Sequence, residues 1–139
     1  KWKFKAFDKN GIIAPGSNFA AKENIYLTDG KAEVLLEKDG LPVVSAYSFG
    51  KGKGIYFSSY KHSTENAKTL LNAILYALGE PLTQKYIPDN LYVECAYYPE
   101  SKTLVAINNS NSAQSAIIDT DSGKIKVSLE PYDTQIIRL

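Results

Sequence analysis

The stretch FGKGKGIYFSS, residues 49–59, alternates glycines with Lys51 and Lys53, and it is the part of the chain that most suggests phosphate chemistry. Phosphate-binding loops place such glycines between a strand and a helix, where backbone N–H groups and the helix N-terminus meet the phosphate. Here the glycines separate two strand-like runs, and neither lysine is followed by Ser or Thr. The pattern therefore predicts a hairpin turn with solvated lysines.

The chain has one histidine, His62, and one cysteine, Cys95. His62 lies between a strand-like run and a helix signal, where general bases often occur. Cys95 lies inside an alternating run and lacks the sharp strand-to-helix turn that presents a nucleophile. We interpret Cys95 as a small core residue and keep a hydrolase built on His62 as an alternative. One His and one Cys do not predict a zinc site.

The remaining polar residues form no recognisable catalytic set. The carboxylates are scattered, and no glycosidase-type pair stands out. Asn108-Asn109-Ser110 matches the N-glycosylation triplet, a pattern that is common by chance. We therefore expect no catalytic residue, cofactor site or metal site in the chain, and we leave the substrate-binding residues open. An alternative is a sugar-binding module that uses Trp2, Tyr97, Tyr98 or Tyr132.

Composition limits the partners and the compartment. The 139 residues carry 16 basic and 15 acidic side chains, so the chain has no overall field that would attract nucleic acid or an anionic membrane. No apolar run approaches the roughly 20 residues that span a bilayer. A single cysteine fits a reducing compartment, and we expect the cytoplasm. Because the chain begins at Lys1 and contains no Met, we expect a fragment or a processed product.

The first eighty residues predict strands followed by one helix. Lysines alternate with apolar residues in KWKFKAF, residues 1–7, which is typical of a strand with one apolar face. A short strand is also expected at 25–27. Three further runs are separated by KDGL and GKGK, which are hairpin connectors. They predict an antiparallel meander with strands at Glu33–Glu37, Pro42–Phe49 and Gly54–Tyr60.

A helix is predicted after the meander, from a cap at Ser63 or Thr64 to Gly79. Apolar residues recur in it at steps of three and four, which predicts one face packed on the sheet, whereas Lys68 and Asn72 lie off that face. We expect Leu71→Asp to unfold the chain. The predicted buried residues are Ala67, Leu70, Leu71, Ile74, Leu75 and Leu78.

The last fifty residues predict strands only. EPLTQKYIPDN, residues 80–90, contains two prolines and is the best internal boundary. Short runs about ten residues apart then predict a small antiparallel sandwich. The five expected strands are Leu91–Tyr98, Thr103–Asn108, Ser115–Asp119, Ile125–Leu129 and Gln135–Leu139.

The segment VLLEKDGLPVVSAYSFGKGKGIYFSSYKHSTENAKTLLNAILYALG, residues 34–79, resembles the later part of the lacto-N-biose phosphorylase family. Members of that family act on galactosyl-N-acetylhexosamine or galactosyl-rhamnose. The resemblance lies in the LLE-x-DG-x-P stretch from Leu35, in FGKG-x-GIY-x-S from Phe49, and in Glu65-Asn66 before an aliphatic helix. The order of strand, turn, strand and helix is also similar to the closing segment of glutamine-amidotransferase-like domains.

The resemblance implies that the parent enzyme carries out phosphorolysis, in which phosphate attacks the anomeric carbon and releases galactose 1-phosphate with inversion. It also implies that the acid and the substrate contacts lie in an N-terminal (β/α)₈ barrel outside this chain. The matched residues are turn glycines, core aliphatics and a helix start. No catalytic role is therefore transferred to any residue here.

We accordingly predict a β-rich α+β chain. Residues 1–80 are expected to close an amidotransferase-like α/β domain, 81–90 to form a linker, and 91–139 to form an antiparallel β-sandwich. The predicted role is non-catalytic: to brace the rest of the parent enzyme, with the barrel and further copies of the chain as partners. No cofactor, nucleic acid or membrane partner is expected.

Overall fold

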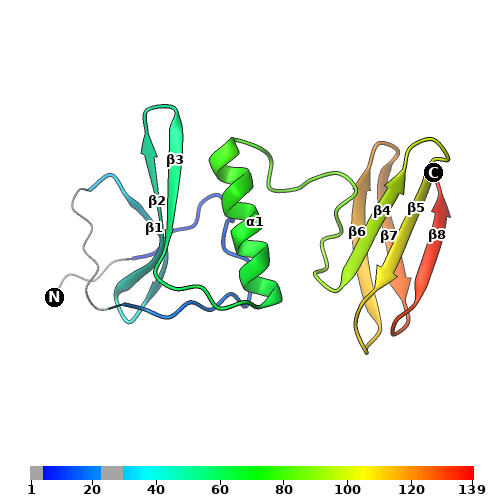
Figure 1. Cartoon of the computed structure of the whole chain (residues 1–139), viewed down its shortest axis with the longest axis horizontal. Helices are drawn as coiled ribbons and strands as arrows, with labels where there is room; N and C mark the ends of the chain where they lie inside the picture. Colours follow the sequence, from blue (N-terminus) through cyan, green and yellow to red (C-terminus); the bar gives the residue numbers. More distant parts are fainter. Residues whose placement is uncertain (1–4, 23–29) are drawn as a thin grey trace. The chain divides into compact units, whose positions relative to one another are not determined.

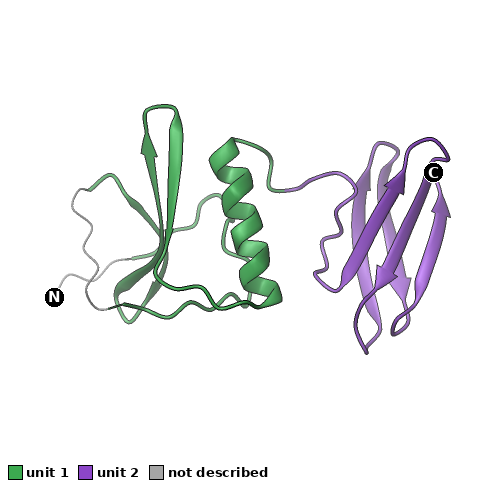
Figure 2. Cartoon of the chain, viewed as in Figure 1, with its two compact units in different colours: residues 1–82 green, residues 83–139 purple. Residues whose placement is uncertain are grey.

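The computed structural model describes residues 5–22 and 30–139, and the chain forms two compact units, residues 1–82 and 83–139 (Figure 2). The strand expected at 25–27 and the aromatic residue Trp2 lie outside the described residues. Of the strand expected at residues 1–7, the described end is irregular, although the Phe7 backbone N–H donates to the Val34 carbonyl oxygen at 2.9 Å. No helix in the described part of the chain is long and apolar enough to cross a membrane.

The first unit contains the predicted meander. Strands β1 (Glu33–Lys38), β2 (Leu41–Phe49) and β3 (Gly52–Phe57) form an antiparallel sheet in that order. At the β2–β3 turn Phe49 pairs with Gly52, and Gly50 has a φ of 57°, a conformation that glycine adopts without steric cost. The Gly-Lys stretch is thus a hairpin turn, as its pattern predicted.

One helix, α1 (Thr64–Leu78), follows the sheet and lies beside it (Figure 1). The side-chain oxygen of Ser63 accepts a hydrogen bond from the Asn66 N–H at 3.1 Å and caps the first turn. At the other end Gly79 has a φ of 81° and donates to the Tyr76 carbonyl at 3.1 Å, which ends the helix. Both predicted ends are confirmed.

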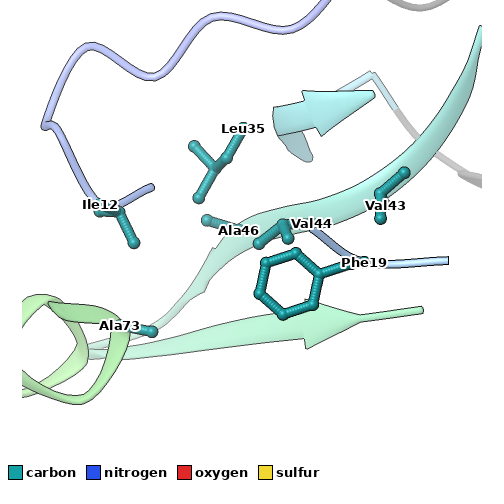
Figure 3. Packing of buried hydrophobic residues seen from close by; sticks show 7 residues of the cluster. All are labelled: Ile12, Phe19, Leu35, Val43, Val44, Ala46 and Ala73. Carbon is teal, nitrogen blue, oxygen red and sulfur yellow. The ribbon is translucent and has the colours of Figure 1, made fainter. Parts of the chain in front are cut away.

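The core of the first unit draws on the sheet, the helix and the irregular N-terminal segment. Figure 3 shows the Phe19 ring beside Val44 of β2, with Ala73 of α1 and Ile12 of the N-terminal segment turned toward the same interior. The Phe19 and Phe57 ring centroids are 5.4 Å apart in a tilted arrangement. The buried apolar cluster consists of Ile12, Phe19, Leu35, Val43, Val44, Ala46 and Ala73.

The second unit is all strand, as the sequence predicted. Its strands are β4 (Val93–Tyr98), β5 (Thr103–Asn108), β6 (Gln114–Thr120), β7 (Gly123–Leu129) and β8 (Thr134–Arg138). They form two antiparallel sheets, one in the order β4-β5-β8 and one of β6 with β7. Alternate side chains of both sheets are buried in one cluster, which includes Leu104 of β5 and Ile118 of β6. The two small antiparallel sheets therefore share one buried core.

Residues 83–90 pack along β6 rather than standing apart from it. The Tyr86 N–H donates to the Asp119 carbonyl at 2.7 Å, and the Ile117 N–H donates to the Asp89 carboxylate at 2.7 Å. Pro88 and Ile118 form an isolated bridge. These contacts place the end of the proline-containing stretch with the second unit, whose boundary falls between Leu82 and Thr83.

Candidate functional site

The two single-copy residues, His62 and Cys95, belong to different units. His62 is exposed in the segment between β3 and α1. Cys95 is half-buried in β4, pairs with Ala106 of β5 and is a free thiol. Desolvation by burial raises the pKa of the Cys95 thiol above its ordinary value, which favours the unreactive protonated form. The environment of Cys95 is that of the core residue its sequence context predicted.

The tyrosines considered as sugar platforms are not brought together. The Tyr97 ring stacks on the Tyr86 ring, with centroids 4.0 Å apart and planes 3° apart, so a neighbouring side chain already covers one face. Tyr98 is exposed and pairs with Thr103 at the start of β5. Tyr132 is also exposed, but its N–H donates to the carbonyl of Ser110, beyond the other end of β5. These two exposed rings therefore do not form one surface.

A polar cluster that the sequence did not reveal surrounds the Tyr86 ring. The Tyr86 hydroxyl donates to an Asp121 carboxylate oxygen at 2.9 Å, and the Lys85 ammonium pairs with the other oxygen of the same carboxylate. The hydrogen bond from Lys85, then that from Tyr86, hold the pKa of Asp121 below its ordinary value. Desolvation, followed by the Asp121 contact, raises the pKa of Tyr86 to about 12.

All the polar atoms of this cluster are engaged with one another, and each group is in its ordinary protonation state at neutral pH. The cluster therefore links residues 83–90 to the β6–β7 turn and is not arranged as an acid–base site. We call these three residues, Lys85, Tyr86 and Asp121, the clasp. The sequence offered no signal for it, because Asp121 lies 36 residues after Lys85 and 35 residues after Tyr86.

Asn108, the first residue of the glycosylation triplet, is a structural residue. It is 1% exposed. Its amide nitrogen donates to the carbonyls of Ser112 and Glu130, each at 2.8 Å, and its side-chain oxygen accepts from the Ser110 N–H at 2.9 Å. The amide thus ties together the loops that follow β5 and β7, and it is inaccessible to a glycosyl donor.

The inward face of α1 is polar, and it binds the backbone of the N-terminal segment. The Thr69 hydroxyl accepts from the Ala14 N–H at 2.8 Å, and the Asn72 amide donates to the Ile12 carbonyl at 3.0 Å. Because residues 12–18 are irregular, their buried backbone groups have no strand partners and need such side chains. The hydrophobic pattern of the helix gave no indication of this role.

The apolar face that the sequence predicted to be buried is instead partly exposed, and none of its residues belongs to the buried cluster of the first unit. The exposed fractions are 36% for Leu70, 38% for Leu71, 49% for Ile74 and 71% for Leu78. Ala67 and Leu75 are intermediate. The prediction that this face packs on the sheet is wrong, because the irregular segment engages the opposite, polar face. The residues buried on α1 are Asn66, Thr69, Asn72 and Ala73.

No cluster of catalytic type links these features. In the ranges 5–22 and 30–139, no three His, Cys, Asp or Glu side chains are grouped so as to hold a metal ion. The buried polar side chains already described, Asn66, Thr69, Asn72 and Asn108, are bonded to the protein backbone. These hydrogen bonds can stabilise the two units. The largest feature that they leave unexplained is the exposed apolar face of α1.

Comparison with known proteins accounts for almost the whole chain. Residues 6–82 match the family model described as the lacto-N-biose phosphorylase central domain, and residues 86–137 match the lacto-N-biose phosphorylase C-terminal domain. The first match alone covers more than half of the 139 residues.

Three curated relatives agree with these matches. A D-galactosyl-β-1→4-L-rhamnose phosphorylase of Lachnoclostridium phytofermentans is 51% identical over 119 residues, which is 86% of this chain. A 1,3-β-galactosyl-N-acetylhexosamine phosphorylase of the same organism is 36% identical over 104 residues. One of that description from Bifidobacterium longum is 27% identical over 101 residues. The matched regions are only 16%, 14% and 13% of the lengths of these relatives.

Proposed function

Because this chain belongs to the lacto-N-biose phosphorylase family, we propose that it is the non-catalytic C-terminal region of an inverting β-galactoside phosphorylase. The observation that carries the proposal is the pair of family matches, 6–82 and 86–137, one to a central and one to a C-terminal domain. The low coverage of the relatives supports a longer parent polypeptide that also contains the catalytic part.

In the proposed reaction of the parent, an oxygen of inorganic phosphate forms a bond to the anomeric carbon of a β-galactoside. The glycosidic C–O bond breaks, and an acid must protonate the departing oxygen. The products are galactose 1-phosphate and the free acceptor sugar. The names of the relatives support N-acetylhexosamine or rhamnose as the acceptor class.

A scaffold role for this chain fits the way its polar side chains are used. Asn66 and Asn108 are deeply buried and bind backbone groups of their own units. His62 is exposed, and the Cys95 thiol is held in its protonated form. None of these residues is positioned as an acid beside a phosphate-binding group, which is what phosphorolysis needs.

We further propose that residues 1–80 close a glutamine-amidotransferase-like α/β domain, since strands, turns and helix follow in the expected order. Linkage through residues 81–90 to a C-terminal sandwich, association into a homo-oligomer and a cytoplasmic location are part of the same proposal. The single cysteine supports the location.

Phosphorolysis by the longer polypeptide tests the proposal. We expect galactose 1-phosphate from β-1,3-galactosyl-N-acetylhexosamine or from β-1,4-galactosyl-rhamnose in the presence of phosphate. We also expect His62→Ala and Cys95→Ala to leave kcat within about twofold, because neither side chain takes part in the reaction. A loss of kcat by 100-fold or more in either variant, with KM and folding unchanged, would refute the non-catalytic role.

A further inference from the structure

The exposed apolar face of α1, here called the α1 stripe, is the feature that the proposed function leaves unexplained. It runs over three turns of the helix and contains no charged side chain. Its members are Ala67, Leu70, Leu71, Ile74, Leu75 and Leu78.

The stripe lies opposite the face by which the helix is held in its own unit. At 100° per residue, the stripe and the buried set that contains Asn66, Thr69 and Ala73 centre roughly 180° apart. On the inward face, polar side chains form hydrogen bonds with residues 12–18, and Ala73 packs in the buried core. The outward face, in contrast, leaves four large aliphatic side chains 36–71% exposed to solvent. Contiguous apolar surface of this kind marks an interaction site.

We propose that the α1 stripe is the docking face for an apolar layer of the same polypeptide, contributed by the part of the parent enzyme outside this chain. The inference rests on the proposed function, because it requires a parent longer than the 139 residues. With that layer in place, α1 is the middle of three layers: the β1–β3 unit, the helix, and the docked layer.

The length of the relatives favours this occupant. The chain matches 16% of the galactosyl-rhamnose phosphorylase, so roughly five-sixths of such a polypeptide is available to cover the stripe. A segment of the same polypeptide is also present at a high effective concentration, which a separate partner is not.

The shape of the stripe argues against a second copy of α1 as the occupant. A two-helix coiled-coil seam needs a narrow row of a and d positions. Here Ala67, Leu71, Ile74 and Leu78 follow the four-and-three spacing of such a row. Leu70 and Leu75, one on each side of it, widen the apolar surface to about 140° of the helix. That width is typical of a helix that packs on a globular core. Over Ala67–Leu78 the stripe is about 16 Å long, enough to cross roughly three strands of a sheet.

Thiol protection measures whether the stripe is covered. In a Cys95→Ala background, Leu71→Cys places a thiol on the stripe, and Lys68→Cys places one on the same helix outside it. Labelling of the helix peptide with iodoacetamide is followed by mass spectrometry, both in the 139-residue chain and in the longer polypeptide. We expect the labelling rate at position 71 to fall at least tenfold in the longer polypeptide, and the rate at position 68 to change less than threefold.

Two results would overturn the inference. Equal labelling at position 71 in both proteins would show that the parent leaves the stripe exposed. Protection at position 71 that already appears in the 139-residue chain and grows with protein concentration would show that a second copy covers it. If the Leu71→Cys chain fails to fold by circular dichroism, Ile74→Cys replaces it, since that side chain is more exposed.

The phosphorolysis assay on the same longer polypeptide separates this inference from the proposed function. Activity with an exposed thiol at position 71 refutes only the docking inference. A protected thiol without phosphorolysis of any β-galactoside refutes only the proposed function.

Discussion

Asn66 and Asn18 are joined by two reciprocal hydrogen bonds. The Asn18 N–H donates to the Asn66 side-chain oxygen, and the Asn66 amide nitrogen donates to the Asn18 carbonyl, each at 2.9 Å. One asparagine on a helix thus gives the irregular segment the pair of contacts that a neighbouring strand would give. This arrangement explains why the inward face of α1 is polar and why its apolar face is left outward.

Replacing Asn66 should destabilise the first unit strongly. The side chain is 3% exposed and also donates to the Lys61 carbonyl at 2.8 Å, so Asn66→Leu removes the partner of three part-buried backbone groups. From the usual free-energy cost of leaving such polar groups without a hydrogen-bond partner, we expect a loss of about 2–4 kcal/mol in the free energy of unfolding. Urea denaturation followed by circular dichroism measures it. Asn109→Leu, at an exposed asparagine, is the control and should change stability by less than about 0.5 kcal/mol.

Leu71→Asp should be tolerated by the 139-residue chain, contrary to the expectation from the hydrophobic pattern. The side chain is 38% exposed and lies away from the buried cluster of the first unit. The expected cost is that of a poorer helix former plus partial loss of packing, about 1 kcal/mol. Thermal unfolding of Leu71→Asp and of Asn66→Leu, measured under the same conditions, compares the loss of stability in the two variants. A larger loss for Leu71→Asp than for Asn66→Leu would contradict the orientation of α1.

The ends of α1 could be predicted from the sequence, whereas its orientation could not. Ser63 and Gly79 act on adjacent backbone groups, so their effect is local and readable from residue type. Which face turns inward depends on what the helix meets, and here it meets residues 12–18, an irregular segment about fifty positions earlier. The apolar period correctly identified a helix, but it could not identify the layer against which that helix packs.

Cys95 should make the stability of the second unit decrease at alkaline pH. Burial raises the pKa of the thiol in the folded chain, so the folded state holds the proton more tightly than the unfolded state. The resulting stabilisation is complete below the ordinary pKa of the thiol and is lost as the pH rises through the folded value. Urea midpoints of the wild-type chain and of Cys95→Ala, measured at about pH 7 and about pH 10, should therefore differ more at the lower pH. A difference that is constant with pH would contradict the burial of this thiol.

Asp121 should act in the opposite direction, at acid pH. The contacts of Lys85 and Tyr86 hold the pKa of its carboxyl below the ordinary value. Its contribution to stability is thus present above that ordinary value and is lost as the pH falls through the folded value. Asp121→Asn should lower the urea midpoint at pH 7, and the difference from wild type should shrink toward pH 2 and in high salt. An unchanged midpoint at pH 7 would show that this exposed clasp adds no stability.

The strands of the second unit follow from the alternation of apolar and polar residues within each run. The sequence therefore predicts both ends of every strand to within two residues. The Lys85–Tyr86–Asp121 clasp was not predicted, because its contacts depend on how residues 83–90 lie against the sheet. The buried role of Asn108 was missed for the same reason, since its partners Ser112 and Glu130 lie in different loops.

The most direct test of the central claim is phosphorolysis by the 139-residue chain itself. The purified chain, shown to be folded by circular dichroism, is incubated with inorganic phosphate and each of the two β-galactoside classes, and galactose 1-phosphate is measured. We expect no product above the enzyme-free control, because the proposed function assigns the catalytic groups to a part of the parent polypeptide outside this chain. Formation of galactose 1-phosphate that increases in proportion to the amount of this chain, and is lost in His62→Ala, would contradict the account.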